Sequence, residues 1–229
     1  MRYVVTGANR GIGLELCRQL LAGGKIVEAA CREPHRAVEL RALPTRPGAE
    51  LHIHACDVVS DESVAAFAKG LAEGGVDVLI NNAGALGKME ALEELDLADV
   101  RNTFDVNALG AIRVTRALLP RLRQGRGRKI LHVSTKMASI ADNTSGGAFG
   151  YRMSKVALNM ASRTMALALR GERIVSVVVN PGWVQTDMGG PGAPTPVGES
   201  ARGILALADR LKLEDSGEFW DYRGDKIEW

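Results

Sequence analysis

Short apolar runs alternate with longer helical stretches along nearly the whole of this 229-residue chain. The runs are rich in β-branched and aliphatic residues, whereas the stretches between them carry apolar residues at the spacing of amphipathic helices. Strands joined by helical crossovers of this length pair in parallel, and their helices cover both faces of the sheet. The alternation therefore predicts an α/β fold with a doubly wound, mostly parallel sheet.

We expect seven strands, at residues 3–5, 26–31, 51–55, 76–80, 130–133, 174–179 and 218–220. We expect helices at residues 12–21, 35–43, 60–72, 95–122, 151–169 and 200–211, the fourth with a break near Asn107. Ser60 or Asp61 could cap the third helix. The Gly- and Pro-rich stretch 189–198 is expected to be a loop, and no linker divides the chain. We therefore expect a single domain over residues 1–229.

Composition excludes several classes of protein. The formal net charge is only +2, so no nucleic-acid partner is expected. The three cysteines, Cys17, Cys31 and Cys56, lack C-x-x-C spacing, so neither a disulfide framework nor a bound metal is indicated. No apolar run reaches the roughly 18 residues of a membrane span, and no signal peptide is visible. A cytoplasmic location is the expectation.

A glycine-rich turn at residues 6–13 directly follows the first expected strand and opens the first expected helix. Glycines let the backbone turn sharply and approach a pyrophosphate, which the N-terminus of a helix attracts. The spacing G-x-x-x-G-x-G differs from the general G-x-G-x-x-G fingerprint, and such a turn can be purely structural. Its position at the first strand–helix junction favours dinucleotide binding. The predicted contacts are Gly7, Asn9, Arg10, Gly11, Ile12 and Gly13.

The end of the second expected strand indicates which dinucleotide is bound. A carboxylate there suits the 2′-hydroxyl of NAD(H), whereas an arginine suits the 2′-phosphate of NADP(H). Arg32 occupies the position, and Arg10 lies in the glycine turn. Two guanidiniums suit charge-assisted phosphate binding, so NADP(H) is the preferred cofactor. Glu33 beside Arg32 leaves NAD(H) open.

Tyr151 and Lys155 are four residues apart, which places both side chains on one face of a helix. A phenol with a pKa of about 10 is a poor acid–base group at neutral pH, and a neighbouring cation lowers that pKa. An isolated pair of this kind is more often a surface pair on an amphipathic helix. Taken with the other motifs, it is a candidate catalytic pair.

Four motifs together resemble the short-chain dehydrogenase/reductase family, in the family's order and at its intervals. They are Thr6-Gly7-x-x-x-Gly11-x-Gly13, Asn81-Asn82-Ala83-Gly84, Tyr151-x-x-x-Lys155 and Pro181-Gly182. The similarity covers essentially the whole chain. From about Asn107 to the end, the sequence more narrowly resembles the C-factor and sniffer-like carbonyl reductase branch.

The resemblance implies a Rossmann-type fold, with Tyr151 as general acid in carbonyl reduction. Lys155 would lower the pKa of Tyr151 and hold the nicotinamide ribose, and Asn107 would hold a water that links Lys155 to solvent. Asp57 would accept from the adenine amino group. The further cofactor contacts implied are Val58 alongside Asp57, Asn82, Ala83 and Gly84 beneath the adenosine ribose, and Pro181, Gly182, Val184 and Thr186 around the nicotinamide.

Each assignment has a plainer alternative. Asp57 could cap a helix, and Asn107 could cap the helix that follows it. Residues 81–84 could be a turn after a buried strand, and Pro181-Gly182 is a turn motif in its own right.

One position departs from the family pattern. The family usually has Ser-Ser after the fifth strand, where the second serine polarises the substrate carbonyl, whereas Thr135 stands there in this chain. Threonine keeps the hydroxyl, but its methyl group restricts χ1 and crowds the pocket. Ser134 and Ser139 are fallback donors, although Ser134 should point to the other side of the strand. Ser139 and Trp183 are the candidate substrate contacts.

We therefore expect an NADP(H)-dependent oxidoreductase acting on a small carbonyl or alcohol, with an open pocket because no lid is inserted after Pro181. An alternative is a C-factor-like cell–cell signalling protein, in which dinucleotide binding matters more than turnover. A catalytically weakened paralogue is a third possibility. Pairing through the long helices near Asn107 and Tyr151 would give a homodimer or homotetramer.

Overall fold

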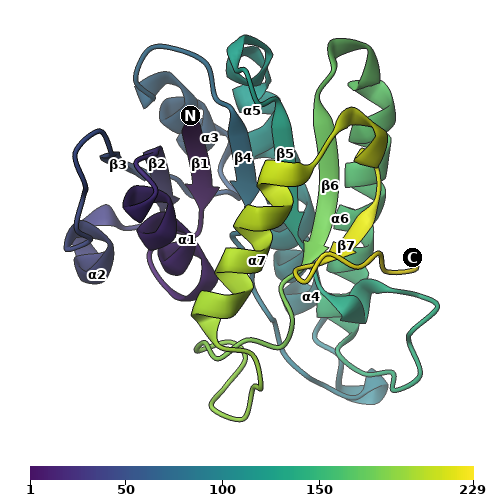
Figure 1. Ribbon diagram of the computed structural model, residues 1–229. Coiled ribbons are helices and arrows are strands. Elements are labelled where there is room, and N and C mark those ends of the chain that lie inside the picture. The colour runs from purple at the N-terminus through teal and green to yellow at the C-terminus, as the bar shows by residue number, and fades with distance from the viewer.

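The computed structural model describes residues 1–229, and its seven strands form one parallel sheet. The order across the sheet is β3-β2-β1-β4-β5-β6-β7, so the direction of strand addition reverses between β1 and β4 (Figure 1). In such sheets, ligands bind at the carboxyl ends of the strands next to this switch point. The strands are β1 (Arg2–Thr6), β2 (Ile26–Cys31), β3 (Glu50–Ala55), β4 (Val78–Asn81), β5 (Lys129–Val133), β6 (Val175–Asn180) and β7 (Phe219–Asp221).

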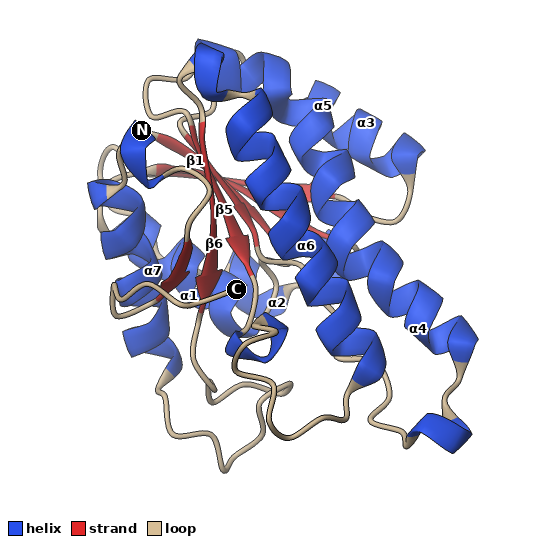
Figure 2. Ribbon diagram, turned by 90° about the vertical axis from the view of Figure 1, so that its right-hand side faces the viewer, coloured by secondary structure: helices blue, strands red, loops and turns tan.

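Helices cover both faces of the sheet (Figure 2). One face carries α1 (Gly11–Ala22), α2 (Val38–Arg41) and α7 (Val197–Arg210). The other carries α3 (Asp61–Gly70), α5 (Gly110–Gln124) and α6 (Phe149–Ala168), with α4 (Leu97–Phe104) packed on α6. Short 3-10 turns lie at Pro34–Arg36, Leu92–Glu94, Lys136–Ala138, Arg170–Glu172 and Leu213–Asp215.

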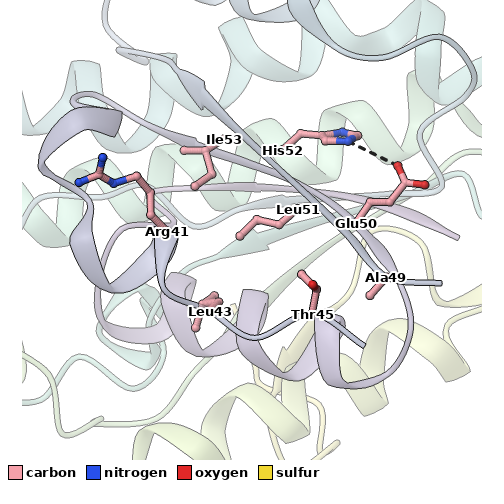
Figure 3. A pocket seen from close by; sticks show the side chains of 8 residues that line it. All are labelled: Arg41, Leu43, Thr45, Ala49, Glu50, Leu51, His52 and Ile53. Carbon is pink, nitrogen blue, oxygen red and sulfur yellow. Dashed lines mark ion pairs between the residues drawn. The ribbon is translucent and has the colours of Figure 1, made fainter. Parts of the chain in front are cut away.

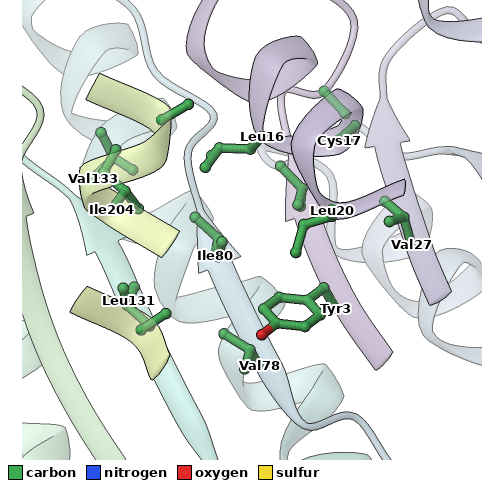
Figure 4. Close-up of a cluster of buried hydrophobic side chains, with 14 of the residues drawn as sticks. Tyr3, Leu16, Cys17, Leu20, Val27, Val78, Ile80, Leu131, Val133 and Ile204 are labelled. Atoms are coloured by element: carbon green, nitrogen blue, oxygen red, sulfur yellow. The ribbon is translucent and has the colours of Figure 1, made fainter. Parts of the chain in front are cut away.

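Two hydrophobic cores flank the sheet because successive strand residues face opposite sides. In β1, Tyr3 and Val5 belong to the core beneath α1 and α7, and Val4 belongs to the core beneath α3 and α5. Figure 4 shows the first core, where Leu16 of α1 and Ile204 of α7 meet Ile80 and Leu131 of the sheet. The central strands are thus buried on both faces, which explains their continuous apolar sequences.

The predicted architecture is confirmed, and the differences lie at the ends of elements. The predicted helix 35–43 is wrong over most of its length, because a 3-10 turn at Pro34–Arg36 precedes only four helical residues. The fourth strand begins at Val78 rather than residue 76, since the Val76 N–H donates to the Arg121 carbonyl at 3.0 Å. Ser60 caps α3 as expected, with its hydroxyl accepting from the Ser63 N–H at 3.1 Å.

The predicted break near Asn107 is confirmed and takes a specific form. A π-helical turn, Asp105–Leu109, joins α4 directly to α5. Single π turns inside helices are frequent at functional sites. No helix of the chain is both long enough and apolar enough to cross a bilayer.

The two edges of the sheet differ. β3 is the outermost strand on one side, and no further strand pairs with it. At the other side, residues 224–229 fold back along β7, where the Ile227 N–H donates to the Phe219 carbonyl at 2.8 Å. The ring of Trp229 lies 5.5 Å from that of Phe219. The C-terminal segment therefore covers the edge that β7 would otherwise expose.

Candidate active site

The glycine turn forms a cradle between β1 and α1. Gly7 and Gly11 have φ of +63° and +54°, a region that side chains disfavour. A Cβ on Gly13 would lie 2.2 Å from the Gly7 carbonyl oxygen, so the helix packs too closely for any other residue. No side chain caps the N-terminus of α1. Its N–H groups and its dipole therefore suit a phosphate group, as the sequence predicts.

Asn82 and Thr6 fix the shape of this cradle. The Thr6 hydroxyl accepts from the N–H groups of Asn82 and Ala83, each at 3.0 Å. The Asn82 amide donates to the carbonyls of Thr6 at 2.9 Å and Gly7 at 3.2 Å. The segment after β4 is thus tied to the glycine turn across the switch point, which a plain turn would not require.

Arg32 lies exposed just beyond β2, and no ion pair or hydrogen bond holds its guanidinium. Glu33, which left NAD(H) open, pairs instead with Arg36 at 3.2 Å. Arg10 in the glycine turn pairs with Asp187 at 3.2 Å, and both side chains are mostly exposed. Arg32 is therefore the cation available to a 2′-phosphate, while Arg10 is shared with a carboxylate.

Asp57 lies at the carboxyl end of β3, and its carboxylate accepts from the Val59 N–H at 3.3 Å. It does not cap α3, because Ser60 does. Val58 is buried, and a Cβ on Gly110 of α5 would come within 2.8 Å of its methyl group. The helix-cap alternative for Asp57 is thus wrong, and its side chain remains at the edge where the cofactor contact was predicted.

Tyr151 lies in the first turn of α6, facing the end of β5. Burial raises the pKa of its phenol above the ordinary value, and a hydrogen bond with the Thr135 hydroxyl opposes this only in part. The Thr135 hydroxyl also accepts from the Met137 N–H at 3.2 Å. Since that bond uses an acceptor site, the Thr135 proton is left to donate. Thr135 is therefore the hydroxyl that the fold places at the phenol.

Lys155 is 4% exposed, and its ammonium donates to the Val133 carbonyl at 2.7 Å. Burial lowers its pKa to about 8. The predicted lowering of the Tyr151 pKa by Lys155 is not found, because the cost of burying the phenolate outweighs other effects on Tyr151. A Cβ on Gly84 would lie 3.5 Å from the Lys155 nitrogen, so the segment after β4 passes directly beside it.

Asn107 sits in the π-helical turn and joins three parts of the site. Its oxygen accepts from the Ala85 N–H at 2.8 Å, and its amide donates to the Ala85 carbonyl at 2.8 Å and the Ser154 hydroxyl at 2.9 Å. Ser154 donates in turn to the Tyr151 carbonyl at 2.8 Å. Asn107 is not a cap, because α5 continues from the π turn without one. It braces the first turns of α6 against the segment after β4.

The fallback hydroxyls have other partners. Ser134 is buried and donates to the Asn159 side chain of α6 at 2.7 Å, so its proton already has a partner. Ser139 is 1% exposed, and its hydroxyl accepts from the Asp142 N–H at 3.2 Å. Ser139 therefore shapes the loop after β5, and its contact with substrate stays a prediction.

The loop after β6 lies over the glycine turn. Gly182 has φ of +83°, which allows the sharp turn after Pro181. The methyl group of Thr186 would lie 3.3 Å from a Cβ on Gly11, so the loop reaches the glycine turn itself. Val184 is buried, whereas Trp183 is 60% exposed and donates to the Gly189 carbonyl at 2.8 Å. Trp183 therefore lies at the exposed edge of the candidate active site.

Other features of the molecule do not compete with this site. The hollow in Figure 3 lies along β3, between Arg41 and Ile53, and none of the predicted catalytic residues lines it. No three His, Cys, Asp or Glu side chains are grouped so that they could hold a metal ion.

The structure also places four polar residues around the site that the sequence did not predict, because nothing in their spacing reveals their partners: Arg152, Ser154, Asn159 and Asn180.

The fold is therefore of the Rossmann type, and the glycine turn lies beside a cluster of Tyr151, Lys155 and Thr135. The sequence profile described as short chain dehydrogenase matches residues 2–195. The chain belongs to the short-chain dehydrogenase/reductase family.

Similar proteins come from distant organisms. The C-signal of Myxococcus xanthus is 55% identical over 164 residues, which cover 72% of this chain and 99% of that protein. Carbonyl reductase Sniffer of D. melanogaster superposes with a TM-score of 0.94 at 31% identity, covering 100% and 99% of the two chains. NADPH-bound carbonyl reductase from chicken fatty liver superposes with a TM-score of 0.90 at 33% identity, covering 100% and 98%.

Proposed function

We propose that this protein is an NADP(H)-dependent oxidoreductase that interconverts small carbonyl compounds and alcohols. The observation that carries the proposal is that the Thr135 hydroxyl lies beside the Tyr151 phenol, one helical turn from the buried Lys155. This cluster lies at the carboxyl edge of the sheet, next to a glycine turn that accepts no larger residue at Gly13. Two neighbouring hydroxyls can both donate to a single carbonyl oxygen.

The residues divide the work of carbonyl reduction. Tyr151 has a raised pKa, so its phenol is neutral at physiological pH and acts as the proton donor. Thr135 donates to the same oxygen as negative charge develops there. Lys155, with a pKa of about 8, exchanges protons near neutral pH and would return a proton to the Tyr151 phenolate after each reduction. A bound nicotinamide supplies the hydride.

The cofactor contacts follow from the cradle. The N–H groups of Gly11, Ile12 and Gly13 would hold the pyrophosphate, and Arg32 would hold the 2′-phosphate that distinguishes NADP(H) from NAD(H). Asp57 would contact the adenine. Support for NADP(H) comes from the unpaired Arg32 and from the NADPH bound to the chicken carbonyl reductase.

A second candidate function is cell–cell signalling. The 55% identity to C-signal favours it, since it exceeds the identity to the carbonyl reductases. In this function, dinucleotide binding would matter more than turnover. Signalling would then require the glycine turn that binds the dinucleotide, but not the Tyr151 phenol.

One experiment separates the two. NADPH oxidation is followed with a panel of aldehydes, ketones and quinones, alongside titrations with NADPH and NADH. We expect turnover in the wild type, NADPH bound more tightly than NADH, and loss of turnover in Tyr151→Phe with NADPH binding unchanged. Preference for NADH would overturn the role of Arg32. A cellular phenotype that survives Tyr151→Phe would favour signalling.

A further inference from the structure

Arg152 follows Tyr151 directly and turns back onto the loop that enters α6. One of its terminal nitrogens donates to the Met137 carbonyl at 2.8 Å, and the other donates to the Ser145 hydroxyl at 2.9 Å. Its Nε donates to the Gly146 carbonyl at 3.2 Å. The guanidinium thus holds both ends of the loop between residues 137 and 146.

The backbone of Met137 links Arg152 to the Thr135 hydroxyl. Its carbonyl accepts from Arg152, while its N–H donates to the Thr135 hydroxyl oxygen at 3.2 Å. The Thr135 hydroxyl in turn lies beside the Tyr151 phenol and partly opposes the rise in its pKa. A continuous polar path therefore runs from Arg152 through the Met137 backbone to the two groups that would meet the substrate.

Arg152 supplies three of the hydrogen bonds that hold the loop, and few other groups contact it. Residues 140–147 are all exposed, and Gly146 and Gly147 have φ of +63° and +69° with open space around them. Apart from Arg152, three contacts hold the loop from outside. The Ala141 N–H donates to the Trp229 carbonyl at 3.1 Å, the Asn159 amide donates to the Ala138 carbonyl at 3.3 Å, and Lys136 pairs with Asp142 at 3.2 Å. The planar fork of arginine is suited to hold several acceptors at once, and a lysine cannot replace that geometry.

We propose that Arg152 is a positioning residue for carbonyl reduction. It fixes the turn that carries Thr135 and the loop beside Tyr151, so that the threonine hydroxyl meets the substrate oxygen in the productive orientation. The inference rests on the proposed reductase function and adds a residue to it that does not itself contact the reacting atoms.

Arg163 offers a matched control. It lies on the same helix, α6, and also donates to a backbone carbonyl, that of Gly217 at 3.2 Å. Gly217 precedes β7 and is not part of the loop beside Tyr151. Removing Arg163 therefore tests the loss of an arginine–carbonyl bond on α6 without touching the path to Thr135.

The test compares Arg152→Ala, Arg152→Lys and Arg163→Ala in NADPH-dependent carbonyl reduction. We expect Arg152→Ala to lower kcat about tenfold or more, because small misplacements of catalytic groups are costly. Arg152→Lys should recover little of it, and Arg163→Ala should keep the wild-type rate. The Kd for NADPH should stay within about twofold in all three, since none of the residues lies at the cradle.

A second measurement distinguishes positioning from general loosening of the fold. Arg152→Ala is combined with Thr135→Val, which lacks the hydroxyl. If Arg152 acts through Thr135, the double variant loses little more than Thr135→Val alone. Fully additive losses, or an Arg152→Ala rate equal to that of Arg163→Ala, would overturn the inference.

Two other outcomes are distinguishable. A wild type without turnover on any carbonyl would refute the proposed function rather than the role of Arg152. Should Arg152→Ala fail to fold, by circular dichroism and thermal unfolding, Arg152→Gln takes its place. It keeps a hydrogen-bonding side chain but loses the fork, and the same fall in kcat is expected.

Discussion

Lys155 and Tyr151 lie one helical turn apart, yet burial moves their pKa values in opposite directions. The pKa of Lys155 falls to about 8, and that of Tyr151 rises above its ordinary value. Both shifts have the same cause, since burial penalises whichever form is charged. The lysine therefore loses its proton at a lower pH than the phenol. The sequence instead predicts that Lys155 lowers the pKa of Tyr151.

This order gives a pH dependence. We expect kcat/KM for reduction to fall as pH rises through about 8, because Lys155 loses its charge there while Tyr151 remains protonated. The measurement is the rate of NADPH oxidation from pH 6 to 10 at fixed ionic strength. A profile that is flat to pH 9.5 would contradict the assignment.

The buried charge of Lys155 also costs stability. Between its native pKa of about 8 and its ordinary 10.5, the unfolded chain binds more protons, so the free energy of unfolding rises with pH in that window. Lys155→Met removes the cost of burying the charge but also loses the hydrogen bond to the Val133 carbonyl, so the net gain in stability is smaller. Urea unfolding at pH 7 should show it more stable by about 1–3 kcal/mol and inactive. Lys69→Met, at an exposed position on α3, is the control and should change little.

Thr135 is the position where this chain departs from the family, and its hydroxyl still reaches Tyr151. We expect Thr135→Ser to keep kcat within about threefold, because the donor is retained, and Thr135→Val to lower it about 100-fold or more. Steady-state kinetics with one aldehyde checks both. A large rise in kcat for Thr135→Ser, without a lower KM, would instead mark a weakened paralogue.

Elements differ in how far the sequence predicts them. Strands buried on both faces, such as β6, have runs of β-branched residues that few other structures accept. The break at Asn107 is foreseeable from the helical pattern, but its π-helical form and the contact of Asn107 with Ala85 are not. The role of Arg152 could not be predicted, because no local pattern shows where the loop at residues 137–146 returns.

The loop after β6 carries a carboxylate that competes for Arg10. Asp187 pairs with it at 3.2 Å across the cradle, and both groups are exposed. Such surface pairs are worth up to about 1 kcal/mol, so Asp187→Asn should tighten NADPH binding by up to about fivefold. Fluorescence titration should show no change for NADH, which lacks the 2′-phosphate. Equal changes for both cofactors would contradict the competition.

At the scale of the whole molecule, α6 leaves an apolar stripe exposed. Met153, Met160 and Leu167 are 53%, 66% and 63% exposed and recur every seven residues, on one face of the helix. Exposed apolar side chains that line up on one face are a candidate surface for contact with another protein. Pairing through the long helices thus remains our prediction for this chain.

Light scattering tests that prediction. We expect a homodimer or homotetramer in the wild type and a shift to monomer in Met160→Asp, because a buried carboxylate without a partner is costly. Val38→Asp is the matched control, since Val38 is 65% exposed on α2, across the sheet from α6. A wild type that stays monomeric at high concentration would remove the prediction.

Because the β7 edge is covered and only the β3 edge is open, the sheet can pair with no more than one other sheet. A fibre built by joining sheets needs two free edges on every molecule, and here the fold-back at residues 224–229 leaves one. Two molecules joined through their β3 edges would have no strand left to offer a third. Polymerisation through the sheet therefore terminates at the first step.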